Sequence, residues 1–116
     1  AAEALVMLDR NDEALEYINM VRTRARMCGG PGNTSPENLT SVSFEDVENE
    51  RQMEFACEGR RFWDLVRWNL ADDYLVGSET AGGFQIQFES PKCDFMPLPA
   101  NEVALSNGIL EQYPGW

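Results

Sequence analysis

Apolar residues recur at helical spacing near the start of the chain. Ala14, Ile18, Val21 and Ala25 share one face of an α-helix that runs to about Met27. A shorter helical pattern covers residues 1–9, and Arg10-Asn11-Asp12 separates the two. The sequence therefore predicts a helical hairpin, similar to the junction between two tetratricopeptide helices. Because the pattern is already present at Ala1, with no initiating methionine or signal peptide, we expect a fragment of a longer protein.

A third, longer helix is predicted from Ser43 to about Trp68, with a bend at Gly59. Ser43 and Asp46 have the spacing of a capping box, which marks the start of a helix. The preceding residues, 28–43, are expected to form a loop because their glycines and prolines cannot continue a helix.

Charged residues share the core-facing side of the predicted third helix with Val47, Phe62 and Leu65. Such charges are costly to bury unless they neutralise one another, as residues three or four positions apart on a helix can do. We therefore predict a partly buried ion network that fixes how the second and third helices cross. It comprises Glu50, Arg51, Glu54, Glu58, Arg61, Asp64 and Arg67, with Arg22, Arg24 and Arg26 of the second helix completing the neutralisation.

Two catalytic or metal-binding interpretations of the same glutamates are disfavoured. Glu50, Glu54 and Glu58 have the spacing of di-iron ligands, but such sites also use Glu-x-x-His motifs and the chain has no histidine. A glycosidase needs one carboxyl group with a raised pKa, whereas the interleaved arginines favour ionised carboxylates. We therefore expect no catalytic residue, no metal and no cofactor.

Composition excludes further classes of function. The chain has 20 acidic against 9 basic residues and a formal charge of -11, so binding to nucleic acid is not expected. Cys28, Cys57 and Cys93 form no CxxC pair, and from the sequence neither a disulfide framework nor a zinc site can be inferred.

The helical pattern stops after Asn69. Residues 84–88 alternate between apolar and polar, which predicts a strand that forms a short β-hairpin with residues 93–96. Residues 101–105 are predicted to form one helical turn. The expected fold is mainly α: a helical hairpin, a long third helix and a loop-rich closing segment. We expect one region, 1–116, with a helical part at 1–69 and an irregular part at 70–116.

The segment ERQMEFACEGRRFWDLVRW, residues 50–68, resembles the ERRxELAFEGxRFFDLVRW signature of the SusD/RagB family. Three further segments agree in the same order. INMVRTRA, which ends at Ala25, resembles INxVRxRAG; FMPLPANEV, from Phe95, resembles YLPIPxxEI; and residues 107–116 resemble NPxLxQNPGY. Departures such as Met53, Cys57 and Arg60 leave the charged residues of the signature unchanged.

The resemblance implies a surface-exposed lipoprotein of the bacterial outer membrane that captures nutrients, glycans or peptides, for a SusC-like TonB-dependent transporter. It implies a helical fold with tetratricopeptide repeats and places this chain in the C-terminal portion, with the lipid anchor and the ligand-contacting residues upstream. Trp63 is the one candidate for sugar stacking here, although packing under the closing segment is the favoured interpretation. The alternatives are a structural helical-repeat module that binds other proteins and, third, a hydrolase.

Overall fold

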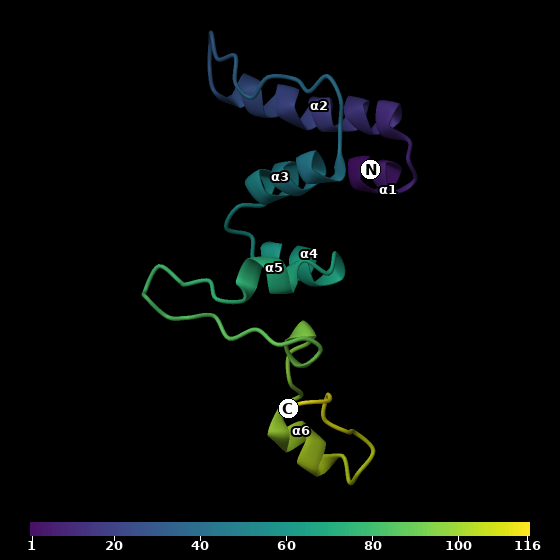
Figure 1. Ribbon diagram of the computed structural model, residues 1–116, viewed down its shortest axis with the longest axis vertical. Helices are drawn as coiled ribbons and strands as arrows, with labels where there is room; N and C mark the ends of the chain where they lie inside the picture. The colour runs from purple at the N-terminus through teal and green to yellow at the C-terminus, as the bar shows by residue number, and fades with distance from the viewer. The chain divides into compact units, whose positions relative to one another are not determined.

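The computed structural model describes all residues, 1–116, and divides them into two compact units, 1–58 and 59–116 (Figure 1). Six α-helices and one 3-10 helix make up its regular structure, so the prediction of a mainly helical fold is confirmed. None of these helices combines the length and the apolar character that crossing a membrane requires.

The first unit begins with the predicted helical hairpin. Helix α1 (Ala2–Met7) and helix α2 (Asn11–Cys28) are joined by a three-residue turn. In this turn Asp9 adopts a left-handed conformation, φ 57°, and the Arg10 N–H donates to the Leu5 carbonyl at 2.9 Å. This hydrogen bond closes the end of α1 and reverses the chain, so that α1 packs back against the start of α2.

The core of the first unit follows the predicted apolar face of α2. Ala14 and Ile18 are buried together with Val42 and Val47, and Leu5, Val6 and Leu15 pack against them. Val21 and Ala25, which lie further along the same face, are only partly buried. The face is therefore covered near the α1 turn and less well covered toward the end of α2.

Helix α3 (Phe44–Glu54) begins with the predicted capping box. The Ser43 hydroxyl accepts a hydrogen bond from the Asp46 N–H at 3.3 Å, and the Asp46 carboxylate accepts one from the Ser43 N–H at 2.8 Å. The two residues thus satisfy backbone donors that the first turn of a helix leaves without a helical partner.

The prediction of one helix from Ser43 to Trp68 is wrong, because two separate helices cover this stretch. Helix α3 ends at Glu54, and helix α4 (Arg61–Arg67) begins after six intervening residues. Between them Cys57 and Gly59 have left-handed φ angles of 65° and 70°, which a right-handed helix cannot include. Gly59 adopts this angle without steric cost, whereas Cys57 carries a side chain and gave no warning of the break.

The second unit packs short helices against irregular chain. Helix α5 (Ala71–Leu75), which the sequence did not predict, follows α4. The buried apolar residues of this unit are Leu65 of α4 and Ala71 of α5. Phe62 of α4 lies 6.3 Å, ring centre to ring centre, from Phe88 of the closing segment. The single helical turn predicted at residues 101–105 is present as helix α6 (Ala100–Leu105).

The predicted pairing of residues 84–88 with 93–96 does not form. Gln85 instead makes a single antiparallel bridge with Glu79, which precedes it. The Cys93 N–H donates to the Glu89 carbonyl at 2.8 Å and Cys93 lies in the 3-10 helix η1 (Lys92–Asp94). Because a helical turn already uses this donor, it is not available to a β-ladder.

Side chains hold the rest of the closing segment. The Gln112 amide both accepts from the Leu98 N–H and donates to the Leu98 carbonyl, each at 2.9 Å. The Trp116 indole N–H donates to the Lys92 carbonyl at 2.7 Å, and the Lys92 ammonium lies 4.7 Å from the indole ring centre. These contacts fix a segment in which irregular chain connects the short helices η1 and α6.

Candidate functional site

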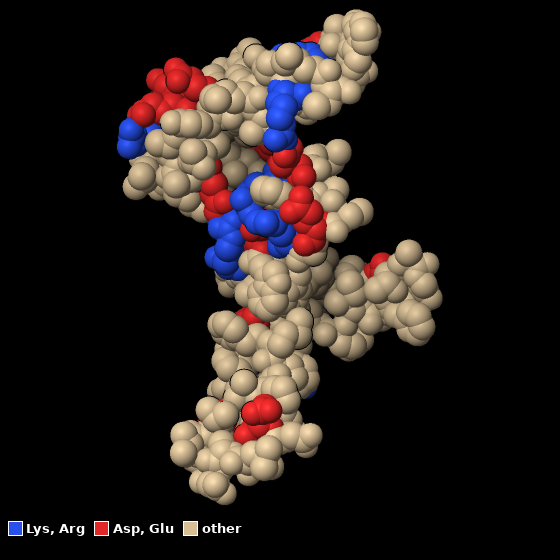
Figure 2. Space-filling view, turned by 180° about the vertical axis from the view of Figure 1, so that it is seen from behind, with Lys and Arg blue, Asp and Glu red and all other residues tan.

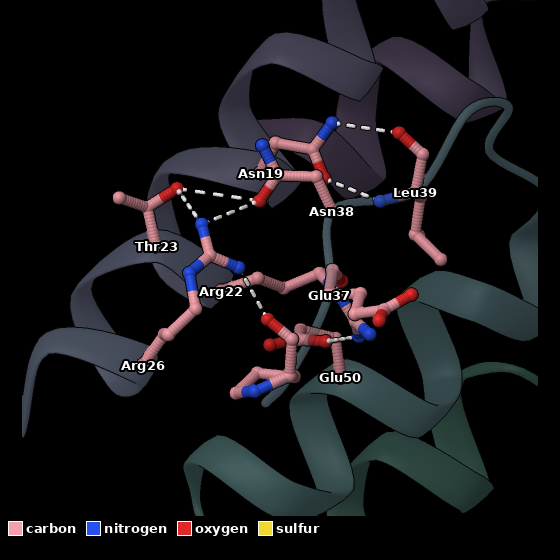
Figure 3. A network of polar contacts seen from close by, with 9 residues as sticks. Asn19, Arg22, Thr23, Arg26, Glu37, Asn38, Leu39 and Glu50 are labelled. Carbon is pink, nitrogen blue, oxygen red and sulfur yellow. Dashed lines mark hydrogen bonds and ion pairs between the residues drawn. The ribbon is translucent and has the colours of Figure 1, made fainter. Parts of the chain in front are cut away.

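A network of polar side chains on α2 binds the loop that connects α2 with α3 (Figure 3). Asn19 makes two hydrogen bonds with the backbone of Leu39. Its Nδ2 donates to the Leu39 carbonyl at 3.0 Å, and its Oδ1 accepts from the Leu39 N–H at 2.8 Å. The Asn19 amide therefore gives Leu39 the partners that a neighbouring strand would otherwise supply.

Arg22 connects three segments of the first unit. Its Nε donates to the Glu37 carbonyl at 2.6 Å, and its terminal nitrogen donates to the Glu50 carboxylate on α3, also at 2.6 Å. Only 21% of the Arg22 side chain and 15% of the Glu50 side chain are exposed, so solvent screens this pair less than it screens surface pairs. One guanidinium thus ties α2 to the loop and to α3 together.

Arg26 binds the loop one turn further along α2. Its guanidinium donates to the Pro36 carbonyl, to the Asn38 side-chain oxygen at 3.1 Å and to the Thr23 hydroxyl at 3.2 Å. Together with Asn19 and Arg22, it satisfies backbone groups in a loop that consists of turns and bends.

Two more arginines pair with acids inside the first unit. Arg24 of α2 donates to the Glu54 carboxylate of α3, and this hydrogen bond raises the pKa of Arg24 above its ordinary value. Arg51 of α3 lies 3.7 Å from the Glu3 carboxylate of α1, with its guanidinium 5.0 Å from the Phe55 ring centre. The arginines of one helix thus neutralise glutamates of another.

The remaining residues of the predicted ion network lie at or beyond the end of the first unit. Asp64 is buried, and its carboxylate accepts from the Arg67 terminal nitrogen at 2.8 Å on the same helix. The Arg61 guanidinium lies 4.9 Å from the Tyr74 ring centre, and Glu58 is exposed. Figure 2 shows basic atoms directly beside acidic atoms on the face in view.

Trp63, the candidate for sugar stacking, is 48% exposed on α4. Its ring meets the Phe62 ring edge to face, with centres 5.0 Å apart and planes at 81°. Packing therefore covers part of Trp63, and part of its surface faces solvent within the second unit.

The charged groups of the first unit are paired with one another across its helices. Glu50 and Glu54 each accept a hydrogen bond from an arginine, so both carboxylates are occupied by contacts within the first unit. No group of three or more His, Cys, Asp and Glu side chains lies close enough together to hold a metal ion.

Sequence reasoning missed how this network binds the loop. It identified the arginines of α2 as partners for the glutamates of the following helix, but not the backbone carbonyls of Pro36, Glu37 and Leu39 as acceptors. The only sequence signal for these contacts was that Asn19 lies in INMVRTRA, the segment that resembles INxVRxRAG. In the structure this segment is joined to Glu50 and Glu54 through the hydrogen bonds that Arg22 and Arg24 donate to them.

Comparisons with known proteins agree on one family. The SusD family model matches residues 1–116, the whole chain. SusD-like protein P2 of Formosa agariphila is 31% identical over 126 residues, which cover 100% of this chain and 23% of that protein. SusD-like protein P38 of the same organism is 35% identical over 78 residues, 64% of this chain and 16% of that protein.

A solved structure agrees with these relatives. Surface glycan-binding protein A from Bacteroides thetaiotaomicron is 30% identical and superposes with a TM-score of 0.70, covering 97% of this chain and 21% of that protein. The chain therefore spans less than a quarter of the length of these relatives. A match over every residue, supported by both sequence and fold, leads to one conclusion: the chain belongs to the SusD family.

Proposed function

We propose that this chain is the C-terminal portion of a surface-exposed outer-membrane protein that captures nutrients, mainly glycans, and delivers them to a SusC-like TonB-dependent transporter. The observation that carries the proposal is the likeness, over 97% of the chain, to a protein named for binding glycans at a surface. The family match over residues 1–116 supports it. The lipid anchor and the ligand-contacting residues then belong to other parts of the full-length protein.

The role that we assign to residues 1–116 is that of a scaffold. Asn19, Arg22 and Arg24 direct their polar groups at the loop and at Glu50 and Glu54 of the same unit. Side chains occupied by such internal contacts support packing and do not reach a ligand. In the same way we propose that the charged residues from Glu50 to Arg67 stabilise helix packing, and that the protein is not an enzyme.

Calorimetric titration of the full-length protein against a library of oligosaccharides and peptides tests the proposed function. We expect saturable binding to a glycan, with an affinity that stays unchanged in Trp63→Ala because the site lies outside this chain. Phe84→Ala, which removes another exposed aromatic ring, is the matched control. Loss of affinity in Trp63→Ala alone would place the site on α4 and contradict the scaffold role.

Partner and location need separate measurements. Affinity purification of the full-length protein from solubilised outer membranes should recover a TonB-dependent transporter, and protease treatment of intact cells should degrade the protein. A full-length protein that binds neither glycans nor peptides but retains a protein partner other than a transporter would instead favour the helical-repeat interaction module.

A further inference from the structure

Residues 84–88, Phe-Gln-Ile-Gln-Phe, alternate like a strand but use only one edge of their backbone. The Ile86 N–H donates to the Ser78 carbonyl at 2.9 Å, and the Phe84 carbonyl accepts from the Thr80 N–H at 2.9 Å. Successive residues of an antiparallel strand direct their backbone groups to opposite edges. The even-numbered residues therefore face residues 78–80 of the same unit.

The opposite edge of this segment is open. Gln85 and Gln87 face it, and both residues are exposed. Neither of their backbone N–H groups donates a hydrogen bond within the chain. The Cys93 thiol, whose sulfur lies 3.9 Å from the Gln87 carbonyl oxygen, is only a weak donor to this edge. A strand edge with such unpaired groups is a template for another extended chain.

The order of residues in this segment is the same in both directions. Phe84-Gln85-Ile86-Gln87-Phe88 is a palindrome. When two copies pair antiparallel about Ile86, Phe84 of one copy lies opposite Phe88 of the other. Gln85 lies opposite Gln87 in the same register, and these are the residues at the open edge. Each Gln85 then exchanges both of its backbone hydrogen bonds with the Gln87 opposite.

Charge and exposure also favour a copy of the same chain as the partner. Residues 80–88 contain no charged side chain, although the chain has a formal charge of -11. Identical strands therefore meet here without placing like charges opposite one another, which would be destabilising. Phe84 is 75% exposed, and Phe88 of a second copy covers it as a cross-strand aromatic pair.

We propose that residues 84–88 form an interface between two copies of the protein, in which the open edges pair antiparallel about a two-fold axis at Ile86. The two-fold axis makes the contact self-complementary, so it closes with two copies and does not propagate. Five residues a side are fewer than the roughly 20–30 of a stable complex, so the dimer is weak and depends on protein concentration. The inference does not rest on the nature of the ligand.

The association can be measured on the full-length protein in detergent. Sedimentation equilibrium gives the dissociation constant of the dimer, and hydrogen exchange followed by mass spectrometry locates the contact. In the wild type we expect a reversible dimer and slower exchange of residues 84–88 as the protein concentration rises. Peptides from α2 and α3 are the internal control and should exchange at the same rate at every concentration.

A matched pair of variants tests the register. Both carry Gln85→Lys, which places an ammonium near the Glu79 carboxylate that the Gln85 amide contacts at 3.1 Å. Adding Gln87→Glu sets opposite charges across the two strands, whereas adding Gln87→Lys sets like charges there. We expect the dissociation constant to be roughly tenfold larger with Gln87→Lys than with Gln87→Glu. Overall charge acts in the opposite direction, because Gln87→Lys makes the acidic protein less negative.

Each possible result supports or overturns the proposal. A wild type that stays monomeric, or a dimer that leaves the exchange of residues 84–88 unchanged, overturns it. Slow exchange of this segment at every concentration also overturns it, because another part of the same molecule then covers the edge. Equal dissociation constants for the two double variants exclude pairing about Ile86. Both substituted positions are exposed, so the fold should tolerate the changes, and an unchanged glycan affinity in each variant checks this independently.

Discussion

The side-chain amide of Asn19 is hydrogen-bonded to both the N–H and the carbonyl of Leu39, twenty residues later in the chain. This pair fixes the returning loop on α2 at a point where the backbone of the loop forms no ladder. The loop in turn delivers the chain to Ser43, where α3 starts. The amide of Asn19 therefore helps to set the position of α3 on the hairpin, together with the ion pairs that Arg22 and Arg24 make with α3.

Replacing Asn19 should loosen the loop. Asn19→Ala removes both hydrogen bonds and should lower the local free energy of opening by about 1–3 kcal/mol, because two partly buried backbone groups lose their partners. Hydrogen exchange of peptides covering residues 36–42 in the full-length protein measures this effect. Asn11→Ala, at the exposed start of α2, is the control, and equal exchange in both variants would contradict the role of Asn19.

Arg22 and Glu50 should be energetically coupled. A double-mutant cycle with Arg22→Ala and Glu50→Ala should give a coupling energy of about 1–2 kcal/mol, because the pair is direct and largely shielded from solvent. The exposed pair Arg10–Glu13, measured in the same way, should show clearly less coupling. Arg22→Lys should recover only part of the loss, since one ammonium cannot reproduce the geometry of a guanidinium that serves two acceptors.

The break between α3 and α4 predicts substitutions of opposite sign. Gly59→Ala should destabilise by about 1–2 kcal/mol because its φ of 70° is strained for a residue with a side chain. An added methyl group meets no atom within 4 Å, so this cost comes from the backbone alone. Cys57→Gly should be neutral or stabilising by up to about 1 kcal/mol, because it relieves the same strain at φ 65°. Urea midpoints check both changes, and an unchanged midpoint in Gly59→Ala would show that residue 59 does not keep its left-handed angle in solution.

The Arg10–Glu13 pair predicts a pH effect of known sign. The hydrogen bond from Arg10 holds the pKa of the Glu13 carboxyl below its ordinary value. The contribution of Glu13 to stability is therefore present above its unfolded-state pKa and is lost as the pH falls through its folded-state pKa. A carboxyl titration followed by NMR should show the Glu13 pKa rise in Arg10→Gln and rise less in Arg10→Lys. The same pKa in all three proteins would show that the pair does not persist in solution.

Local rules predicted the parts of the fold that depend on neighbours in sequence. The hairpin, the capping box at Ser43 and the turn at residues 101–105 each follow from a pattern of a few residues. The same rules failed between Glu54 and Arg61, because a helical wheel assumes right-handed angles and cannot detect a left-handed Cys57. They also missed α5, which has five residues and is too short for a periodic pattern.

In the candidate site, too, some contacts could be predicted from the sequence and others could not. Arginines of α2 could be assigned to glutamates of the next helix because charges that share a buried face must be neutralised. The bond from Asn19 to Leu39 and the bond from Arg22 to the Glu37 carbonyl could not be assigned. They join a helix to an irregular loop, and the course of such a loop does not follow from a periodic pattern.

The amide of Gln112 has a consequence for how samples of this protein age. Hydrolysis of that amide to a carboxylate leaves two acceptors and no donor in front of the Leu98 carbonyl, which now receives its hydrogen bond from Gln112. A change of one mass unit would thus remove one of the two hydrogen bonds at Leu98, while the Leu98 N–H could still donate to the carboxylate. In a preparation where Gln112 had deamidated in some molecules, the intact mass would give the proportion that has lost the hydrogen bond to the Leu98 carbonyl.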